Sequence, residues 1–232
     1  MPFPRSPRVV YEKNPLVEVT CELRFPVILR IETETPSRFQ ERIRGEYPQY
    51  ERDSPPGVPA PMLDTLKQLG VPPLILGGNV HKFLAEDRKR WIAVGTRPQS
   101  TQSFLALTER NYRQWEDFRL QFQSAEQQCR EEYSPAYYSR VGLRYRDRLA
   151  PAELGLKDRP WSDLLTTATA GILTTPGVEN AIARMDCGAL FRIDEEVPGG
   201  FMHVRYGLSS EQEPGAQVFI IDIDCYKEGR LS

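Results

Sequence analysis

The chain has 232 residues, of which 40% are hydrophobic and 27% charged, a composition typical of an ordinary globular protein. Its formal net charge of -2 gives no general attraction to nucleic acid or to an anionic membrane surface. No apolar run approaches the roughly 18 residues that a membrane-spanning helix needs, and the first residues lack the apolar segment of a signal peptide. We therefore expect a cytoplasmic protein with no membrane partner.

The N-terminal region predicts an arm followed by a strand. Residues 1–14 are rich in proline and charge and predict a loose arm. In residues 15–26, PLVEVTCELRFP, apolar and polar side chains alternate, as they do in a half-buried strand. The apolar phase continues to Ile31, so we expect extended chain that far. Pro26 cannot donate to a ladder and predicts an edge, a bulge or the end of regular pairing.

Two short helices are predicted after this strand. Phe39, Ile43 and Tyr47 recur at every fourth position and predict an amphipathic helix that begins near Thr35 and Pro36. The sequence RDSPPGVPAP then predicts a linker or a long surface loop, because proline and glycine interrupt regular structure. The following PMLDTLKQLG predicts the second short helix, which its final glycine would end.

A hairpin, a strand and the longest helix come next. Residues 81–86 and 91–95 predict a hairpin around the charged turn EDRKR, and residues 103–107 predict a third strand of the same group. The longest helix is predicted at about residues 109–132, with Thr108 as its N-cap. Its stripe, at spacings of three and four, consists of Tyr112, Trp115, Phe118, Phe122, Ala125 and Cys129. Such a stripe favours a face that packs on a sheet over a cofactor site.

The strand pattern returns after the long helix and predicts the fold class. Strands are expected at YSRVGLRYRDRL, ARMDCGALFRID, FMHVRYGL and QVFIIDIDCY, with a short helix at about residues 160–170. Consecutive strands joined by short turns, such as the glycine pair at 199–200, predict mainly antiparallel pairing. We expect an α+β fold: strongly twisted, mainly antiparallel sheet(s) in which two β-α-β-β-β-like halves pack around the long aromatic helix. Residues 15–232 would form one domain, with halves at about 15–132 and 133–232.

Common catalytic and metal-binding motifs are absent from the sequence. The only histidines are His81 and His203, and there is no HExxH, GxSxG, P-loop or GxGxxG. No two cysteines lie at a CxxC spacing, and each lies in an apolar phase, so all four are expected to be buried thiols. They are Cys21, Cys129, Cys187 and Cys225.

The polar phases of the predicted strands carry many charges of both signs. They collect Glu18, Glu22, Arg24, Arg140, Arg144, Arg146, Arg148, Arg184, Asp186, Arg192, Asp194, His203, Arg205, Asp222 and Asp224. The structural interpretation is a solvated face with cross-strand ion pairs. The functional interpretation is a concave, charge-lined face that binds an anion or a metal-bound anion. The sequence favours the structural interpretation, because interspersed signs neutralise one another.

One segment suggests a specific enzyme hypothesis. TCELR is similar to the ExExK strand of triphosphate tunnel enzymes, in which two glutamates hold a metal ion and a lysine binds phosphate. Thr20 replaces the first glutamate and Arg24 the lysine, so the motif lacks part of the ligand set. The catalytic residues of this hypothesis are Glu22, Arg24, Arg144, Asp222 and Asp224. Glu22, Asp222 and Asp224 would hold Mg²⁺ or Mn²⁺.

A third hypothesis is RNA binding. SRVGLRYRDRL interleaves arginines with Tyr145, and arginine with an aromatic ring suits phosphate contacts and base stacking. However, Tyr145 lies on the phase opposite the arginines, and the net charge is acidic. Nucleic acid is therefore a disfavoured partner.

Several motifs in combination resemble a known family. NPLVEVTCELRF, NYRQWEDFRLQF, YSRVGLRYRDRL and VFIIDIDCY resemble a sporadically distributed family of uncharacterised prokaryotic proteins with PLxExxxExRF, an RxGLRY block and a late DxD strand. The resemblance spans about residues 11–226 and implies a bacterial accessory protein. The sporadic distribution of the family suggests a stress or defence locus. It brings no cofactor or catalytic set. Members of that family continue past the DxD strand, so we expect this chain to be short at its C-terminus.

The sequence thus leads to one preferred function and two alternatives. The preferred function is a non-enzymatic module that binds a protein or a small molecule and needs no cofactor. The first alternative is the metal-dependent phosphohydrolase of tunnel type, and the second is an RNA-binding accessory protein. The sequence leaves homo-oligomer formation open.

Overall fold

The structure, a computed structural model, describes residue 7 and residues 14–53, 79–96, 101–157, 159–175, 177, 181–210 and 217–231. Its strands are β1 (Leu16–Pro26), β2 (Gln49–Asp53), β3 (Val80–Leu84), β4 (Arg90–Thr96), β5 (Gln102–Glu109), β6 (Tyr138–Leu149), β7 (Cys187–Arg192), β8 (Gly200–Ser210) and β9 (Gln217–Leu231). Its helices are α1 (Leu29–Thr33), α2 (Ser37–Ile43), α5 (Trp115–Tyr133), α6 (Trp161–Leu164), α7 (Thr167–Ala170) and the 3-10 helix η1 (Gly171–Thr174). The helix predicted from PMLDTLKQLG lies outside the described residues.

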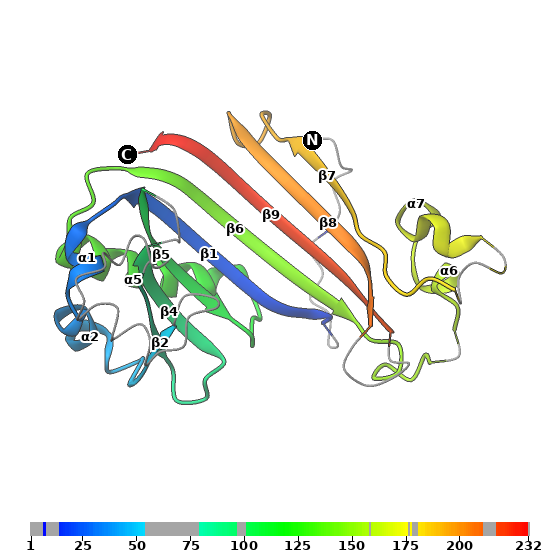
Figure 1. Cartoon of the computed structure of the whole chain (residues 1–232), viewed down its shortest axis with the longest axis horizontal. Helices are drawn as coiled ribbons and strands as arrows, with labels where there is room; N and C mark the ends of the chain where they lie inside the picture. Colours follow the sequence, from blue (N-terminus) through cyan, green and yellow to red (C-terminus); the bar gives the residue numbers. More distant parts are fainter. Residues whose placement is uncertain are drawn as a thin grey trace, which may run out of the picture. The chain divides into compact units, whose positions relative to one another are not determined.

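The strands form one nine-stranded antiparallel sheet in the order β2-β3-β4-β5-β1-β6-β9-β8-β7 (Figure 1). Helix α5 packs against β5 and against α2. The predicted α+β fold class, with a long helix on an antiparallel sheet, is therefore confirmed. No helix in the described part of the chain is both long enough and apolar enough to span a membrane.

The chain divides into two compact units. Unit 1 consists of Met1–Val17 and Arg144–Cys225, and unit 2 of Glu18–Leu143 and Tyr226–Ser232. The division falls within β1, β6 and β9, so each of these strands has residues in both units. The halves expected from the sequence, at about residues 15–132 and 133–232, stay a prediction.

The core of unit 2 forms where β1, β3 and β5 meet the helices. Leu23 of β1 pairs with Leu105 of β5, and both are buried. The Phe39 ring of α2 lies 5.5 Å from the Phe83 ring of β3 and 5.9 Å from the Tyr133 ring of α5. Close aromatic contacts of this kind join the helices to the sheet. The predicted apolar face of α2 is thus buried against its neighbours.

Two predicted boundaries in unit 2 are wrong, and one strand was not predicted. The long helix begins at Trp115 rather than near residue 109, because Thr108 belongs to β5, where its Oγ1 lies 3.0 Å from Thr20 Oγ1 of β1. Cross-strand pairing extends β5 to Glu109 and overrides the cap signal. The extended chain predicted up to Ile31 ends at Pro26, and helix α1 follows. Strand β2 was not expected, and its last two residues are the first two of the predicted linker.

Unit 1 has a separate, smaller core. Trp161 of α6 and Phe219 of β9 have ring centroids 5.7 Å apart. The buried residues of this core are Trp161, Ala170, Leu173, Leu208 and Phe219. The short helix predicted near residues 160–170 is present as two helices, α6 and α7, in this core. The short helices therefore cover the apolar ends of β8 and β9.

Candidate functional site

The five residues of the tunnel hypothesis divide between the two units. Glu22 and Arg24 belong to unit 2, whereas Arg144, Asp222 and Asp224 belong to unit 1. The sheet order ends at β2 and β7, so the described strands leave two edges and do not close into a barrel. Among the described residues, no group of three or more His, Cys, Asp or Glu side chains is arranged to hold a metal ion. The tunnel hypothesis gains no support here and stays a prediction.

Glu22 in unit 2 is buried although it lies on the polar phase of β1. Only 8% of the residue is exposed. Its Oε1 accepts hydrogen bonds from Arg24 Nε at 2.7 Å and from Arg140 at 3.3 Å. A buried carboxylate requires such donors, because its desolvation is otherwise too costly. This side of β1 therefore anchors the structure and is not simply a solvated face.

Arg140 is the buried partner of Glu22 and reverses the expected pattern at the start of β6. Arg140 is 6% exposed, while its apolar neighbour Val141 is 36% exposed. The Arg140 guanidinium lies 4.6 Å from the centroid of the Tyr226 ring and 3.7 Å from Glu228. A Cβ atom on Gly142 would lie 2.3 Å from a guanidinium nitrogen of Arg140. The glycine of the RVGLRY segment therefore leaves room for this buried arginine.

Asp222 of β9 is the centre of an ion-pair network in unit 1. Its carboxylate accepts hydrogen bonds from Arg144 Nε of β6 at 2.7 Å, from Arg144 Nη2 at 2.5 Å and from Arg205 Nη2 of β8 at 2.8 Å. Burial alone would raise the pKa of Asp222, but the two arginines outweigh that effect and hold it below its usual range. Asp224, two residues along β9, is half-buried. These contacts are the cross-strand pairs that the structural interpretation predicted.

The cysteines differ in accessibility. Cys21 and Cys129 are buried, and burial raises the pKa of each thiol to about 12, so neither is an activated nucleophile. Cys225 is half-buried. Cys187 is exposed, which contradicts the prediction of four buried thiols. The physical reason is that β7 is the last strand of the sheet and most of its side chains face solvent.

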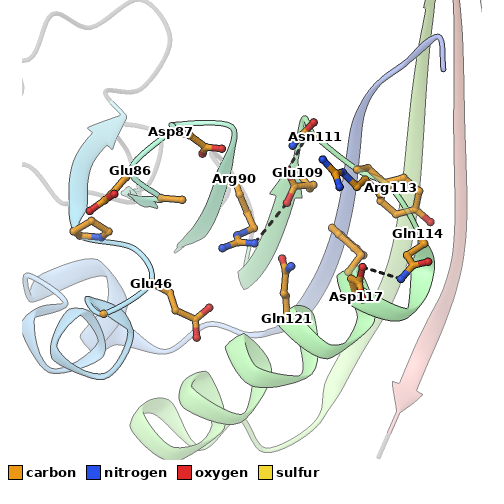
Figure 2. Close-up of a pocket in the computed structure, with 15 residues that line it drawn as sticks. Glu46, Glu86, Asp87, Arg90, Glu109, Asn111, Arg113, Gln114, Asp117 and Gln121 are labelled. Atoms are coloured by element: carbon orange, nitrogen blue, oxygen red, sulfur yellow. Dashed lines mark hydrogen bonds and ion pairs between the residues drawn. The ribbon is translucent and has the colours of Figure 1, made fainter. Parts of the chain in front are cut away.

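A polar pocket in unit 2 forms a second candidate site, and the sequence did not predict it (Figure 2). Its volume is about 580 Å³. Four regions surround it: the turn after α2, the β3–β4 turn, the segment from the end of β5 to α5, and the first turns of α5. Its charged residues are Glu46, Glu86, Asp87, Arg90, Glu109, Arg113 and Asp117. Five carboxylates therefore face two guanidinium groups, and the pocket is acidic.

Arg90 and Glu109 form the inner part of this polar pocket. They occupy paired positions on β4 and β5, and their charged atoms are 3.9 Å apart. The Arg90 guanidinium lies 5.4 Å from the centroid of the buried Tyr47 ring. Burial raises the pKa of Glu109, although the Asn111 amide and Arg90 act against it. The long Arg90–Glu109 separation leaves donor capacity on the arginine.

Within the part of the chain that the structure describes, two buried polar atoms of residues lining the polar pocket have no hydrogen-bond partner. They are Arg90 Nε, a donor, and Gln121 Oε1, an acceptor. Figure 2 shows the Gln121 side chain rising from α5 toward Arg90 and Glu109. A buried polar atom without a partner costs roughly 1–3 kcal/mol, so native proteins seldom leave two of them in one place. Both atoms are covered although their residues line the cavity, so a bound polar molecule would satisfy them only after a rotation of the Arg90 or Gln121 side chain.

Sequence reasoning missed this polar pocket for identifiable reasons. The charges of EDRKR were interpreted only as a hairpin turn, although Glu86, Asp87 and Arg90 line the cavity. Glu109 was assigned to the long helix, whereas it ends β5 and pairs with Arg90. Gln121 lies beside the apolar stripe of α5 and carried no signal of its own. These groups line one cavity only because the fold brings their segments together.

Comparisons with known proteins do not assign a family. No protein-family model matches the sequence, and no curated protein matches it. Among solved structures, the chain is similar to the crystal structure of the Trypanosoma brucei AdoMetDC-delta26 monomer, with 8% sequence identity and a TM-score of 0.23. The match covers 91% of this chain and 65% of that chain. A similarity this low carries no functional argument.

Proposed function

We propose that the protein is a ligand-binding module and that its ligand is a small organic cation held in the polar pocket of unit 2. The proposal rests on one observation: Arg90 Nε and Gln121 Oε1 are buried without a hydrogen-bond partner among the described residues, and both residues line a cavity where carboxylates are in excess. The sequence likewise favoured a binding module over an enzyme.

The size and lining of the polar pocket support a small polar ligand. A volume of about 580 Å³ lies within the range of roughly 300–1,000 Å³ that small-molecule sites occupy. Most such sites are mainly apolar, but charged and amide side chains dominate this one. The excess of carboxylates, at Glu46, Glu86, Asp87 and Asp117 around the exposed rim, would attract a positive charge.

Arg90 and Gln121 indicate which polar groups the ligand carries in addition to its positive charge. Arg90 Nε requires an acceptor, and Gln121 Oε1 requires a donor. A hydroxyl group meets both requirements because it donates one hydrogen bond and accepts others. The ligand class that fits is therefore an amine or guanidinium compound that also carries a hydroxyl or an amide.

The experiment is a binding screen with matched probes. Ligand-observed NMR would compare amino alcohols and argininamide with neutral alcohols and with carboxylates of equal size. We expect binding by the cationic probes alone. Binding of the carboxylates at equal strength would contradict the proposed ligand class.

A variant separates binding from folding. Gln121→Leu removes the unpartnered acceptor while keeping a side chain of similar volume, so it should abolish probe binding and leave the protein stable. We expect it to raise the free energy of unfolding by about 1 kcal/mol, since an unsatisfied buried atom is lost. Gln127→Leu, on the same helix but bonded to Glu131, is the control and should bind the probes normally. Normal binding by Gln121→Leu would refute the assignment of the site.

A further inference from the structure

Unit 1 contains a second cavity, of opposite charge to the polar pocket. We call it the arginine pocket; its volume is about 400 Å³. Its charged lining residues are Arg144, Arg184, Asp186, Arg205 and Asp222. Three guanidinium groups therefore face two carboxylates, and the arginine pocket carries an excess of positive charge.

We infer that the arginine pocket binds the phosphoryl group of a small ligand through Arg144, Arg184 and Arg205. This site is separate from the polar pocket and does not depend on the function proposed for it.

The Asp222 carboxylate organises two of the three arginines. It is buried on β9 and holds Arg144 from β6 on one side and Arg205 from β8 on the other. Their side chains are nevertheless 43% and 54% exposed, so both guanidinium groups extend from the buried carboxylate to the cavity. An arginine held on one side by a carboxylate presents a planar, oriented set of donors with little remaining conformational freedom.

The third arginine comes from the segment before β7. Met185 donates its backbone N–H to Leu208 O at 3.0 Å, which holds this segment against β8. Gly207 permits the approach, because a Cβ atom there would lie 1.8 Å from Met185 O. Arg184 and Asp186 on either side of Met185 then line the arginine pocket.

The Arg184–Asp186 ion pair leaves Arg184 able to change partner. Its N–O distance is 2.6 Å, but the two side chains are 76% and 71% exposed. An ion pair exposed to this extent contributes little to stability, so a phosphoryl group can replace Asp186 as the partner at small cost.

The chemistry favours phosphate over carboxylate. A phosphoryl group has three terminal oxygens and accepts hydrogen bonds from guanidinium groups on three different segments at once. A carboxylate has two oxygens, which one bidentate arginine already satisfies. The three arginines around one cavity therefore match a phosphoryl group more fully.

The test is titration of the whole chain with phenyl phosphate at low ionic strength, followed by phosphorus NMR and calorimetry. We expect saturable binding of phenyl phosphate, and weaker binding of benzoate by at least about tenfold. Absence of phenyl phosphate binding, or benzoate binding of equal strength, would overturn the inference.

Variants assign the binding to the arginine pocket. Arg205→Gln and Arg184→Gln should each weaken phenyl phosphate binding about tenfold or more, the loss of one charge-assisted contact. Arg184 is mostly exposed and outside the core, so its replacement tests the site even if Arg205→Gln alters folding. Arg159→Gln is the control: it removes the same charge from an exposed pair with Asp163 outside the lining residues. An equal loss in Arg159→Gln, or none in Arg184→Gln, would refute the site.

Discussion

Unit 1 and unit 2 each bury a carboxylate against an arginine from a neighbouring strand, but they expose that arginine differently. In unit 2, the Glu22 and Arg140 side chains are both buried, at 11% and 7% exposure. In unit 1, the Asp222 side chain is 10% exposed, while those of Arg144 and Arg205 reach the surface. A buried carboxylate can thus anchor the sheet, as in unit 2, or form the inner layer of a surface pocket, as in unit 1. The exposure of the guanidinium groups decides which role it has.

The largest expected effect is in unit 2. Glu22→Ala removes the buried carboxylate from the Arg140 guanidinium and leaves the longer contact to the mostly exposed Glu228, so we expect a loss of about 3 kcal/mol in the free energy of unfolding. Urea denaturation followed by tryptophan fluorescence measures it. The double variant Glu22→Leu/Arg140→Met is the control and should recover much of the loss, because it leaves no buried charge. A loss below about 1 kcal/mol in Glu22→Ala would show that Arg140 is not a buried anchor.

The second effect is the pH dependence of unit 2. His81 is buried, and its Nδ1 lies 2.8 Å from the Tyr50 hydroxyl. Burial, with a contribution from Arg52, lowers its pKa to about 4. The unfolded chain takes up the proton near pH 6.5, so stability should fall as the pH drops from about 6.5 to 4, by up to about 3 kcal/mol.

His81→Gln isolates this contribution. The difference in unfolding free energy between the native chain and the variant should change with pH only within that window. Asp222 of unit 1 should act in the same direction but at lower pH, because its lowered pKa stabilises the fold above the usual carboxyl pKa and this stabilisation is lost in more acidic solution. A pH-independent difference for His81→Gln would contradict a buried neutral histidine.

A smaller loss is expected from the anchor of unit 1. Asp222→Asn keeps the shape but removes the charge between Arg144 and Arg205, and we expect a cost of about 1–2 kcal/mol. The cost should be below that of Glu22→Ala, since both arginines can turn toward water. Thermal denaturation of both variants at one pH makes the comparison. A larger loss for Asp222→Asn would reverse the distinction between the two units.

The smallest effect tests the space beside Arg140. Gly142→Ala should cost about 1 kcal/mol, because the new methyl group would displace the Arg140 guanidinium from Glu22. The cost should shrink in an Arg140→Met background, where no guanidinium occupies the space. If Gly142→Ala costs as much in that background, its effect arises from the backbone conformation and not from contact with Arg140.

The sequence predicted some features because they depend on local periodicity. The alternation in β1, the four-residue repeat of α2 and the hairpin around EDRKR all appear in the structure. The start of α5 was misplaced by several residues because pairing of β5 with β1 and β4 extends the strand to Glu109. The charged phases were correctly identified as a source of cross-strand ion pairs, such as Arg144 with Asp222. Their partners could not be assigned, since strand order does not follow from periodicity.

By itself, the sequence determined the α+β class, the antiparallel strands and the charges available to each strand. Those properties follow from side-chain period and turn residues, which act over a few neighbours. Only the tertiary structure decided that Arg140 is buried and Val141 exposed, that Cys187 is accessible, and which residues surround the two pockets. Burial and cavities depend on segments distant in sequence, such as the EDRKR turn and α5, and no local pattern specifies which of them meet.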